Sequence, residues 1–166
     1  VIPDGVTEIG FSAFCKCLSL TSVTIPDSVK TIDREAFYGC NNLKNVTIGN
    51  GVKSIGNYAF SKCSSLDSVT LSKNIKALGI EAFAGCSDLK EITCYACVPP
   101  TCGEQALNGI DILGCQLKVP TGCMDAYKAA DQWKDFFFIE DVLEVAKYTI
   151  TYMVDNEVYK SVDYTY

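Results

Sequence analysis

The sequence predicts an α/β solenoid, a stack of rungs that each contain short strands and a short helical turn. Two observations carry this prediction: a unit of 23 residues is written four times without an insertion or a deletion, and each apolar position recurs in every copy. The copies occupy residues 1–24, 25–47, 48–70 and 71–93. A fixed period of this length is typical of stacked repeats. Because one unit cannot bury its own apolar face, the core must form between neighbouring copies.

Each copy orders its apolar residues in the same way. Two aliphatic residues come first, followed by an Ala-Phe pair, a Cys, a Leu and a closing aliphatic-Thr pair; in the second copy these are Val29, Ile32, Ala36, Phe37, Cys40, Leu43, Val46 and Thr47. The closing segment has the period of two that marks a strand, which turns Val46 inward and Thr47 outward. Polar residues precede the Ala-Phe pair, so we expect a short helical turn there, on the opposite face.

The period breaks after Thr93, and residues 94–139 are predicted to form a divergent rung and a cap. Thr121 is the expected N-cap of a short helix. A dense apolar cluster follows, at Trp133, Phe136, Phe137 and Ile139. A solenoid must cover its last open rung, and bulky aromatic residues serve that purpose. We therefore expect one leucine-rich repeat solenoid domain over residues 1–139.

The remaining residues are predicted to form a linker and a hairpin. Residues 140–146 are short and acidic, which indicates a linker. Two segments that alternate with period two flank a turn signal at residues 155–157, so residues 147–166 are expected to form a β-hairpin. An isolated hairpin is marginally stable, so we interpret it as the start of a truncated β module. The sequence also starts inside the first repeat without Met, so we expect a fragment of a longer protein.

The repeat pattern is similar to a known family. The spacing Leu43-x-x-Val46-x-Ile48 is the strand signature of leucine-rich repeats, and the pattern I-P-x-x-V-x-x-I-x-x-x-A-F-x-x-C-x-x-L-x-x-V-T resembles the BspA-type repeats of bacterial cell-surface proteins. Residues 119–135 resemble the segment that closes many such arrays, and the hairpin resembles a Listeria–Bacteroides type module. The resemblance implies an extracellular or cell-surface protein with a role in adhesion.

Composition and charge exclude several function classes. The formal net charge is −6, and the Lys and Arg residues are spread singly along the sequence, which favours neither a nucleic acid nor an anionic membrane as partner. No apolar run has the roughly 18–20 residues needed to cross a bilayer, so we expect no membrane insertion by this segment. The chain has no His, which deprives a Ser or Cys nucleophile of its commonest base. We therefore predict a protein without catalytic activity, metal or cofactor.

Nine of the ten cysteines, all except Cys15, divide into two groups. Those that follow the repeat period are predicted to be buried packing residues: Cys17, Cys40, Cys63 and Cys86. The spacing Cys94-x-x-Cys97 suits a zinc site or a thiol redox pair, which we keep as the least favoured function because nothing completes a zinc site and Cys94 should point inward. A disulfide is the other interpretation if the protein is exported, among Cys97, Cys102, Cys115 and Cys123.

The outward side chains of the strands are the predicted binding surface, because solenoids usually bind partners through variable residues on a rigid sheet. The candidate residues are Thr21, Thr24, Lys44, Asn45, Thr47, Asp67, Ser68, Thr70, Lys90, Glu91 and Thr93. The row of Thr residues has a second interpretation, side-by-side packing of residues that favour strands. The leading hypothesis is recognition of an unknown protein or glycan on host or neighbouring cells. The alternative is a structural stalk that presents another domain.

Overall fold

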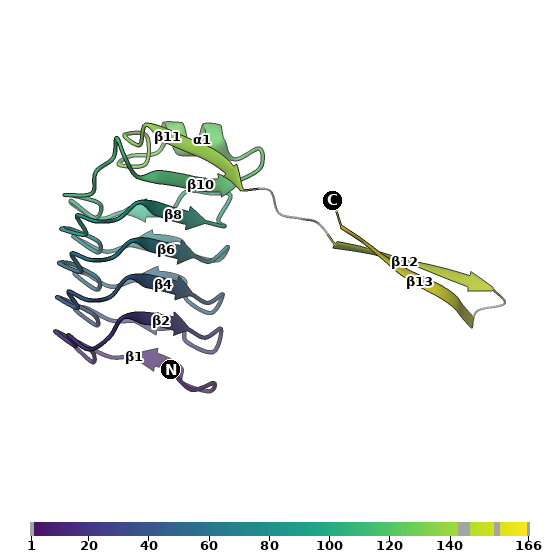
Figure 1. The fold of residues 1–166 in the computed structure, drawn as a ribbon, viewed down its shortest axis with the longest axis horizontal. Helices are drawn as coiled ribbons and strands as arrows, with labels where there is room; N and C mark the ends of the chain where they lie inside the picture. The colour runs from purple at the N-terminus through teal and green to yellow at the C-terminus, as the bar shows by residue number, and fades with distance from the viewer. Residues whose placement is uncertain (1, 143–146, 155–156, 166) are drawn as a thin grey trace.

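The computed structural model describes residues 2–142, 147–154 and 157–165. Residues 2–142 form a parallel β-solenoid with two sheets that run along its length (Figure 1). The five-stranded sheet contains β1 (Glu8–Ile9), β3 (Thr31–Ile32), β5 (Ser54–Ile55), β7 (Ala77–Leu78) and β9 (Thr101–Cys102), in that order. The six-stranded sheet contains β2 (Ser22–Ile25), β4 (Asn45–Ile48), β6 (Ser68–Leu71), β8 (Glu91–Cys94), β10 (Gln116–Pro120) and β11 (Phe138–Val142), in that order.

Within the four repeats, the register of both sheets equals the sequence period. In the six-stranded sheet Val23 lies opposite Val46, and Val46 lies opposite Val69. In the five-stranded sheet Ile32 lies opposite Ile55. Each step to the next rung is therefore one step of 23 residues, so identical repeat positions stack on one another.

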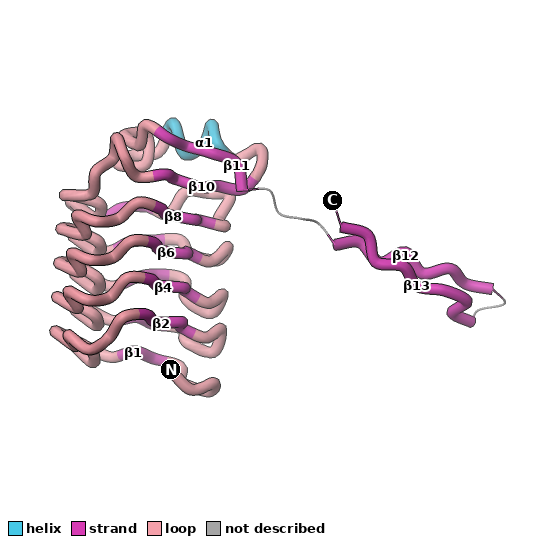
Figure 2. Tube along the Cα trace, in the orientation of Figure 1, coloured by secondary structure: helices cyan, strands magenta, loops and turns pink. Residues whose placement is uncertain are grey.

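The segments around the Ala-Phe pairs are turns rather than helices, which corrects the α/β part of the predicted fold class. Each repeat has two positions with positive φ, such as Glu35 at 58° and Gly39 at 68°, and right-handed helices do not accommodate such residues. The N–H of Phe37 donates to the carbonyl of Ala59 in the next rung, at 2.7 Å. Backbone donors that a helix would use internally therefore link the rungs. Within the described residues the only helix is α1 (Met124–Ala129), in the cap (Figure 2).

The apolar core runs along the solenoid without a break between rungs. The aromatic ring of each Ala-Phe pair stacks on the ring of the next rung, with centroid distances of 5.1, 5.0 and 5.2 Å and nearly parallel planes. The stacked residues are Phe14, Phe37, Phe60 and Phe83. The repeat places the same ring at the same point in each rung, so the core is a set of columns rather than a single cluster.

The predicted cap covers the fifth rung, and it does so with hydrogen bonds as well as rings. Trp133 and Tyr127 are fully buried and meet edge to face. The Trp133 indole N–H donates to the carbonyl of Pro100 at 2.7 Å, and the Tyr127 hydroxyl donates to the carbonyl of Ala96 at 2.7 Å. These two carbonyls lie in the last repeat-like rung, where buried backbone acceptors need a partner.

At the open end of the array, the side chain of Gln132 makes a hydrogen bond that the backbone of a further rung would make. Inside the array the N–H of Phe83 donates to the carbonyl of Ala106. At the end of the array the equivalent N–H, that of Leu107, donates to the side-chain oxygen of Gln132, and the Gln132 amide donates to the carbonyl of Gly103. The Gln132 side chain thus satisfies the donor that a further rung would have satisfied, and it also bonds to the Gly103 carbonyl, which accepts from the Ala106 N–H as well.

The helix of the cap starts differently from the prediction. It begins at Met124 with Cys123 in the N-cap position, so Thr121 is not the N-cap. Gly122, with φ of 80°, turns the chain between Thr121 and the helix. Cys123 forms a disulfide with Cys97, which ties the start of the helix to the fifth rung.

The last strand of the solenoid extends into the predicted linker. β11 pairs in parallel with β10 through residues 140–142, so these three residues belong to the sheet, whereas residues 143–146 lie outside the described residues. Beyond them, β12 (Lys147–Val154) and β13 (Glu157–Thr165) pair in antiparallel fashion as a separate two-stranded sheet. The prediction that this pair begins a longer β module remains a prediction.

Candidate functional site

The outward side of the six-stranded sheet carries the predicted binding residues in straight rows, which we call the strand face. One row takes one residue from each strand: Ser22, Asn45, Ser68, Glu91, Gln116 and Phe138. A second row contains Thr24, Thr47, Thr70, Thr93, Lys118 and Glu140. Thr21, Lys44, Asp67 and Lys90 stand at the entry to the strands, at the same repeat position. Neighbouring strands are about 4.8 Å apart, so six strands give a surface about 24 Å long.

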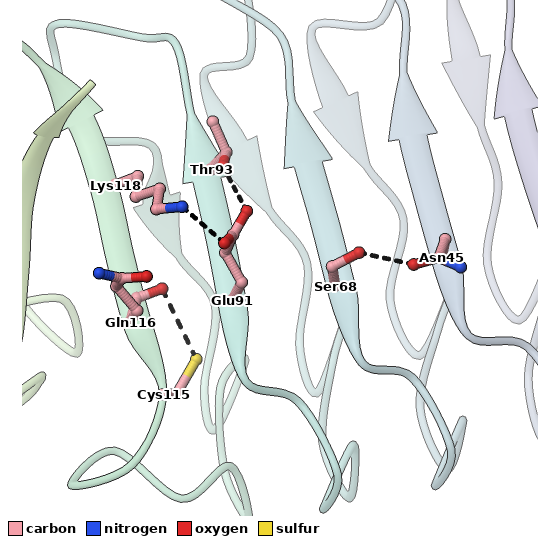
Figure 3. Close-up of polar contacts among 7 residues, drawn as sticks. All are labelled: Asn45, Ser68, Glu91, Thr93, Cys115, Gln116 and Lys118. Atoms are coloured by element: carbon pink, nitrogen blue, oxygen red, sulfur yellow. Dashed lines mark hydrogen bonds and ion pairs between the residues drawn. The ribbon is translucent and has the colours of Figure 1, made fainter. Parts of the chain in front are cut away.

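Opposite charges from neighbouring rungs meet on the strand face (Figure 3). The Lys90 ammonium lies 2.7 Å from the Asp67 carboxylate, and the Lys118 ammonium lies 2.7 Å from the Glu91 carboxylate. The Glu91 carboxylate also accepts a hydrogen bond from the Thr93 hydroxyl at 3.2 Å. The hydrogen bond from each lysine to its carboxylate raises the pKa of Lys90 and of Lys118. Both ammonium groups are therefore charged at neutral pH.

A further polar contact lies on the strand face, on the N-terminal side of the two ion pairs. The Ser68 hydroxyl donates to the side-chain oxygen of Asn45 at 2.8 Å (Figure 3). At the other end of the face, the Cys115 thiol lies 4.0 Å from the carbonyl oxygen of Gln116. Seven polar side chains of the strand face are thus held by neighbouring side chains: Asn45, Asp67, Ser68, Lys90, Glu91, Thr93 and Lys118.

Accessibility along the strand face falls toward the cap. Thr24 and Thr47 are exposed, and Thr70 is half-buried. Thr93 is only 7% exposed, because it lies beside Lys118 in the sheet and bonds to Glu91. The predicted Thr row therefore offers side chains to a partner over the first three rungs, and Thr93 does not belong to the accessible site.

The strand face is longer than the sequence indicated, because β10 and β11 of the cap continue it. Gln116, Lys118 and Phe138 occupy the same rows as the repeat residues, and Phe138 is 47% exposed. The sequence contains a signal for this continuation, since Leu117-Lys118-Val119 alternates as Ile92-Thr93-Cys94 does. The absence of the 23-residue spacing hid this correspondence.

Three of the four periodic cysteines are buried packing residues, as predicted, whereas Cys17 in the first rung is only half-buried. Cys40, Cys63 and Cys86 are fully buried. Each thiol contacts the carbonyl of the Phe one rung earlier, as Cys63 does with Phe37 at 3.2 Å. Burial raises the pKa of Cys86 to about 12, so its thiol stays protonated. A small side chain with a weak donor suits a buried position that faces a backbone carbonyl.

The Cys94-x-x-Cys97 pair does not form a redox site in the structure. Cys97 is bonded to Cys123, and Cys94 is a fully buried free thiol. Burial raises the pKa of Cys94, whereas a reactive thiol needs a lowered one. Over residues 2–142, 147–154 and 157–165, no group of three or more His, Cys, Asp or Glu residues could hold a metal ion. Among the same residues, no helix has the length and apolar character of a membrane span.

Comparisons with known proteins agree with the repeat pattern. A family model described as the BspA type leucine-rich repeat region matches residues 1–108, in six copies. A comparison with curated proteins finds no match.

Solved structures of bacterial leucine-rich repeat proteins resemble the solenoid. The crystal structure of a T. pallidum leucine-rich repeat protein is 29% identical with a TM-score of 0.61, over 71% of this chain and 54% of that one. A leucine-rich cell surface protein from Faecalibacterium prausnitzii is 25% identical with a TM-score of 0.47, over 93% of this chain and 46% of that one. The chain spans about half the length of these solved proteins.

Proposed function

The chain belongs to the BspA-type leucine-rich repeat family, and from this premise we propose that it is a non-catalytic recognition segment of a cell-surface or secreted protein. The strand face is the proposed contact surface, and a protein on a host or neighbouring cell is the proposed partner. The observation that carries the proposal is a rigid frame of identical rungs whose outward residues differ from copy to copy, as at Thr21, Lys44, Asp67 and Lys90.

Two further features support this proposal. The ion pairs of the strand face fix both signs of charge in known positions before a partner arrives, which lowers the cost of ordering side chains on binding. The disulfide between Cys97 and Cys123 is of the kind that persists in an oxidising compartment outside the cytosol.

The strand face can be tested with a fourfold variant, Lys44→Ala, Asp67→Ala, Lys90→Ala and Glu91→Ala. We expect its saturable binding to epithelial or bacterial cells to weaken at least about tenfold, because charged pairs at an interface commonly contribute this much. Binding of the fluorescently labelled protein is measured by flow cytometry. The matched control carries Asp4→Ala, Lys16→Ala, Glu104→Ala and Lys128→Ala, which also removes two positive and two negative exposed charges.

Comparison of the two variants tests whether the strand face is the contact surface. Full binding by the control and weak binding by the strand-face variant supports the proposed surface. Equal binding by both variants contradicts it, and so does a strand-face variant whose circular dichroism spectrum matches the wild type while its binding is unchanged.

A structural stalk that presents another domain is the second candidate function, because each added rung lengthens the array and leaves its two ends unchanged. Deletion of residues 48–70 is expected to leave a folded solenoid, since Ile25 and Leu71 occupy equivalent positions and the register of both sheets is retained. The array becomes shorter by about 4.8 Å. A stalk keeps its activity in the cell-binding assay, whereas a recognition face that uses β4 and β6 loses affinity. A deletion variant that fails to fold, judged by its melting curve, contradicts the independence of the rungs.

A further inference from the structure

Lysines that are far apart in the sequence form a row on the solenoid, away from the strand face. Lys30, Lys53 and Lys76 occupy the same repeat position, and each directly precedes a strand of the five-stranded sheet. The N–H of Lys76 donates to the carbonyl of Lys53 at 2.7 Å, so the backbones of these rungs are adjacent. All three side chains are exposed. Lys73, in the turn of the fourth rung, is exposed beside them, and we call these four residues the lysine row.

The charges of the lysine row are not used inside the protein. Within the described part of the chain, none of the four ammonium groups is in an ion pair. The Lys30 ammonium donates to the backbone carbonyl of Asp27 rather than to its carboxylate. The Asp27 carboxylate accepts from Asn50. The repeat position of Asp4 and Asp27 is taken by Asn50 in the third rung and by Lys73 in the fourth, so the carboxylates of this position belong to the first two rungs.

The lysine row contrasts with the strand face. On the strand face successive rungs alternate in sign, and Asp67 pairs with Lys90 while Glu91 pairs with Lys118. In the lysine row successive rungs repeat one sign, which is unfavourable to the fold because like charges on adjacent strands repel. The chain as a whole carries a net charge of −6. A local excess of positive charge in an acidic protein points to an external anion.

A groove lies at the end of the lysine row. Its volume is about 580 Å³, and Lys73, Lys76 and Asn74 line it together with Val98, Pro99 and Thr101. Val98 is 80% exposed, and the disulfide of Cys97 borders the groove and holds this loop against the cap. The groove therefore combines two ammonium groups, amide and hydroxyl groups, and a small apolar surface.

We propose that the lysine row and this groove bind a linear anionic polysaccharide that lies along the solenoid. Its sulfate or carboxylate groups contact Lys53, Lys73 and Lys76. Its hydroxyls meet Asn74 and Thr101, and a C–H face of a sugar ring packs on Val98. The residues that line the groove include no aromatic side chain on which a nucleic-acid base could stack. This choice of residues favours a sugar over a single-stranded nucleic acid.

The proposal is tested by calorimetric titration with heparin as the sulfated probe, hyaluronan as the carboxylated probe and dextran as the neutral probe. We expect binding to at least one anionic probe and none to dextran. The triple variant Lys53→Gln, Lys73→Gln and Lys76→Gln should bind at least about tenfold more weakly. Its slope of log Kd against log salt should fall by about two, because fewer counterions are displaced. The side chains are exposed, so melting curves should match the wild type.

The control variant is Lys16→Gln, Lys128→Gln and Lys134→Gln, which removes three exposed lysines outside both the lysine row and the strand face and changes the net charge by the same amount. Retained affinity in this control supports the site. An equal loss in the control overturns it, since binding then follows overall charge. No binding of heparin or hyaluronan by the wild type in about 50 mM salt, where counterion release still favours binding, also overturns it. So does equal or tighter binding of oligo-dT or polyglutamate, which would assign the row to a nucleic acid or an acidic peptide.

Discussion

Replacement of Phe60 by Ala is expected to lower the free energy of unfolding by about 3–5 kcal/mol. Phe60 is fully buried and stacks on Phe37 on one side and on Phe83 on the other, at 5.0 and 5.2 Å. The substitution removes both ring contacts and leaves a cavity in the third rung, which cannot collapse because the rungs on either side hold the spacing. Urea unfolding followed by circular dichroism measures the loss.

Phe14 provides the matched control for this prediction. It has the same repeat position and neighbours Phe37 on one side, at 5.1 Å, but it is only half-buried in the first rung. Phe14→Ala should therefore cost clearly less than Phe60→Ala, because less apolar area leaves the core. An equal cost for the two variants would show that stacking along the column does not determine the stability.

Removal of the disulfide, by Cys97→Ser and Cys123→Ser together, is the second substitution with a large expected effect. The bond closes a loop with a sequence separation of 26, for which chain entropy predicts a loss of about 3 kcal/mol in the free energy of unfolding. The bond joins the fifth rung to the start of α1, so the loss should affect the cap first. Hydrogen exchange of residues 94–139 should rise more than that of residues 25–70.

The control for the disulfide is Cys15→Ser, which alters a half-buried free thiol. Dithiothreitol should destabilise the wild type and the Cys15→Ser variant alike, and it should leave the double variant unchanged. If the reductant destabilised the double variant equally, the effect would not arise from the bond between Cys97 and Cys123.

The array could be predicted from the sequence because its information is local and repeated. An inward Val46 alternates with an outward Thr47, and the spacing from Phe37 to Cys40 recurs in each copy. An interpretation that is ambiguous in one copy can therefore be checked against the other three. The conformation of the Ala-Phe segments could not be predicted in the same way. Composition around Ala36 suits a helix, yet the inter-rung hydrogen bonds of Phe37 and Gly39 determine turns with positive φ, and these bonds exist only once the rungs are stacked.

For the candidate sites as well, one part could be predicted from the sequence and another part depends on the stacked structure. Alternation along each strand was enough to name Thr24, Thr47 and Thr70 as outward residues of the strand face, and the structure arranges them in one row across the sheet. The burial of Thr93 was outside the reach of that reasoning, because it depends on Lys118, which the chain reaches only after a rung of different length.

The sequence by itself determined the period of the repeats, the identity of the core columns and the position of the cap, since each follows from side-chain type at a fixed spacing. Only the tertiary structure decided which polar groups meet. Lysines that are 23 residues apart appear isolated in the sequence, yet parallel stacking brings Lys30, Lys53 and Lys76 into one row, and the turn after β8 brings Cys97 to Cys123. Stacking places residues that are one repeat apart in the sequence on neighbouring strands, about 4.8 Å apart in space. Electrostatic and covalent contacts depend on this distance in space and not on the separation in the sequence.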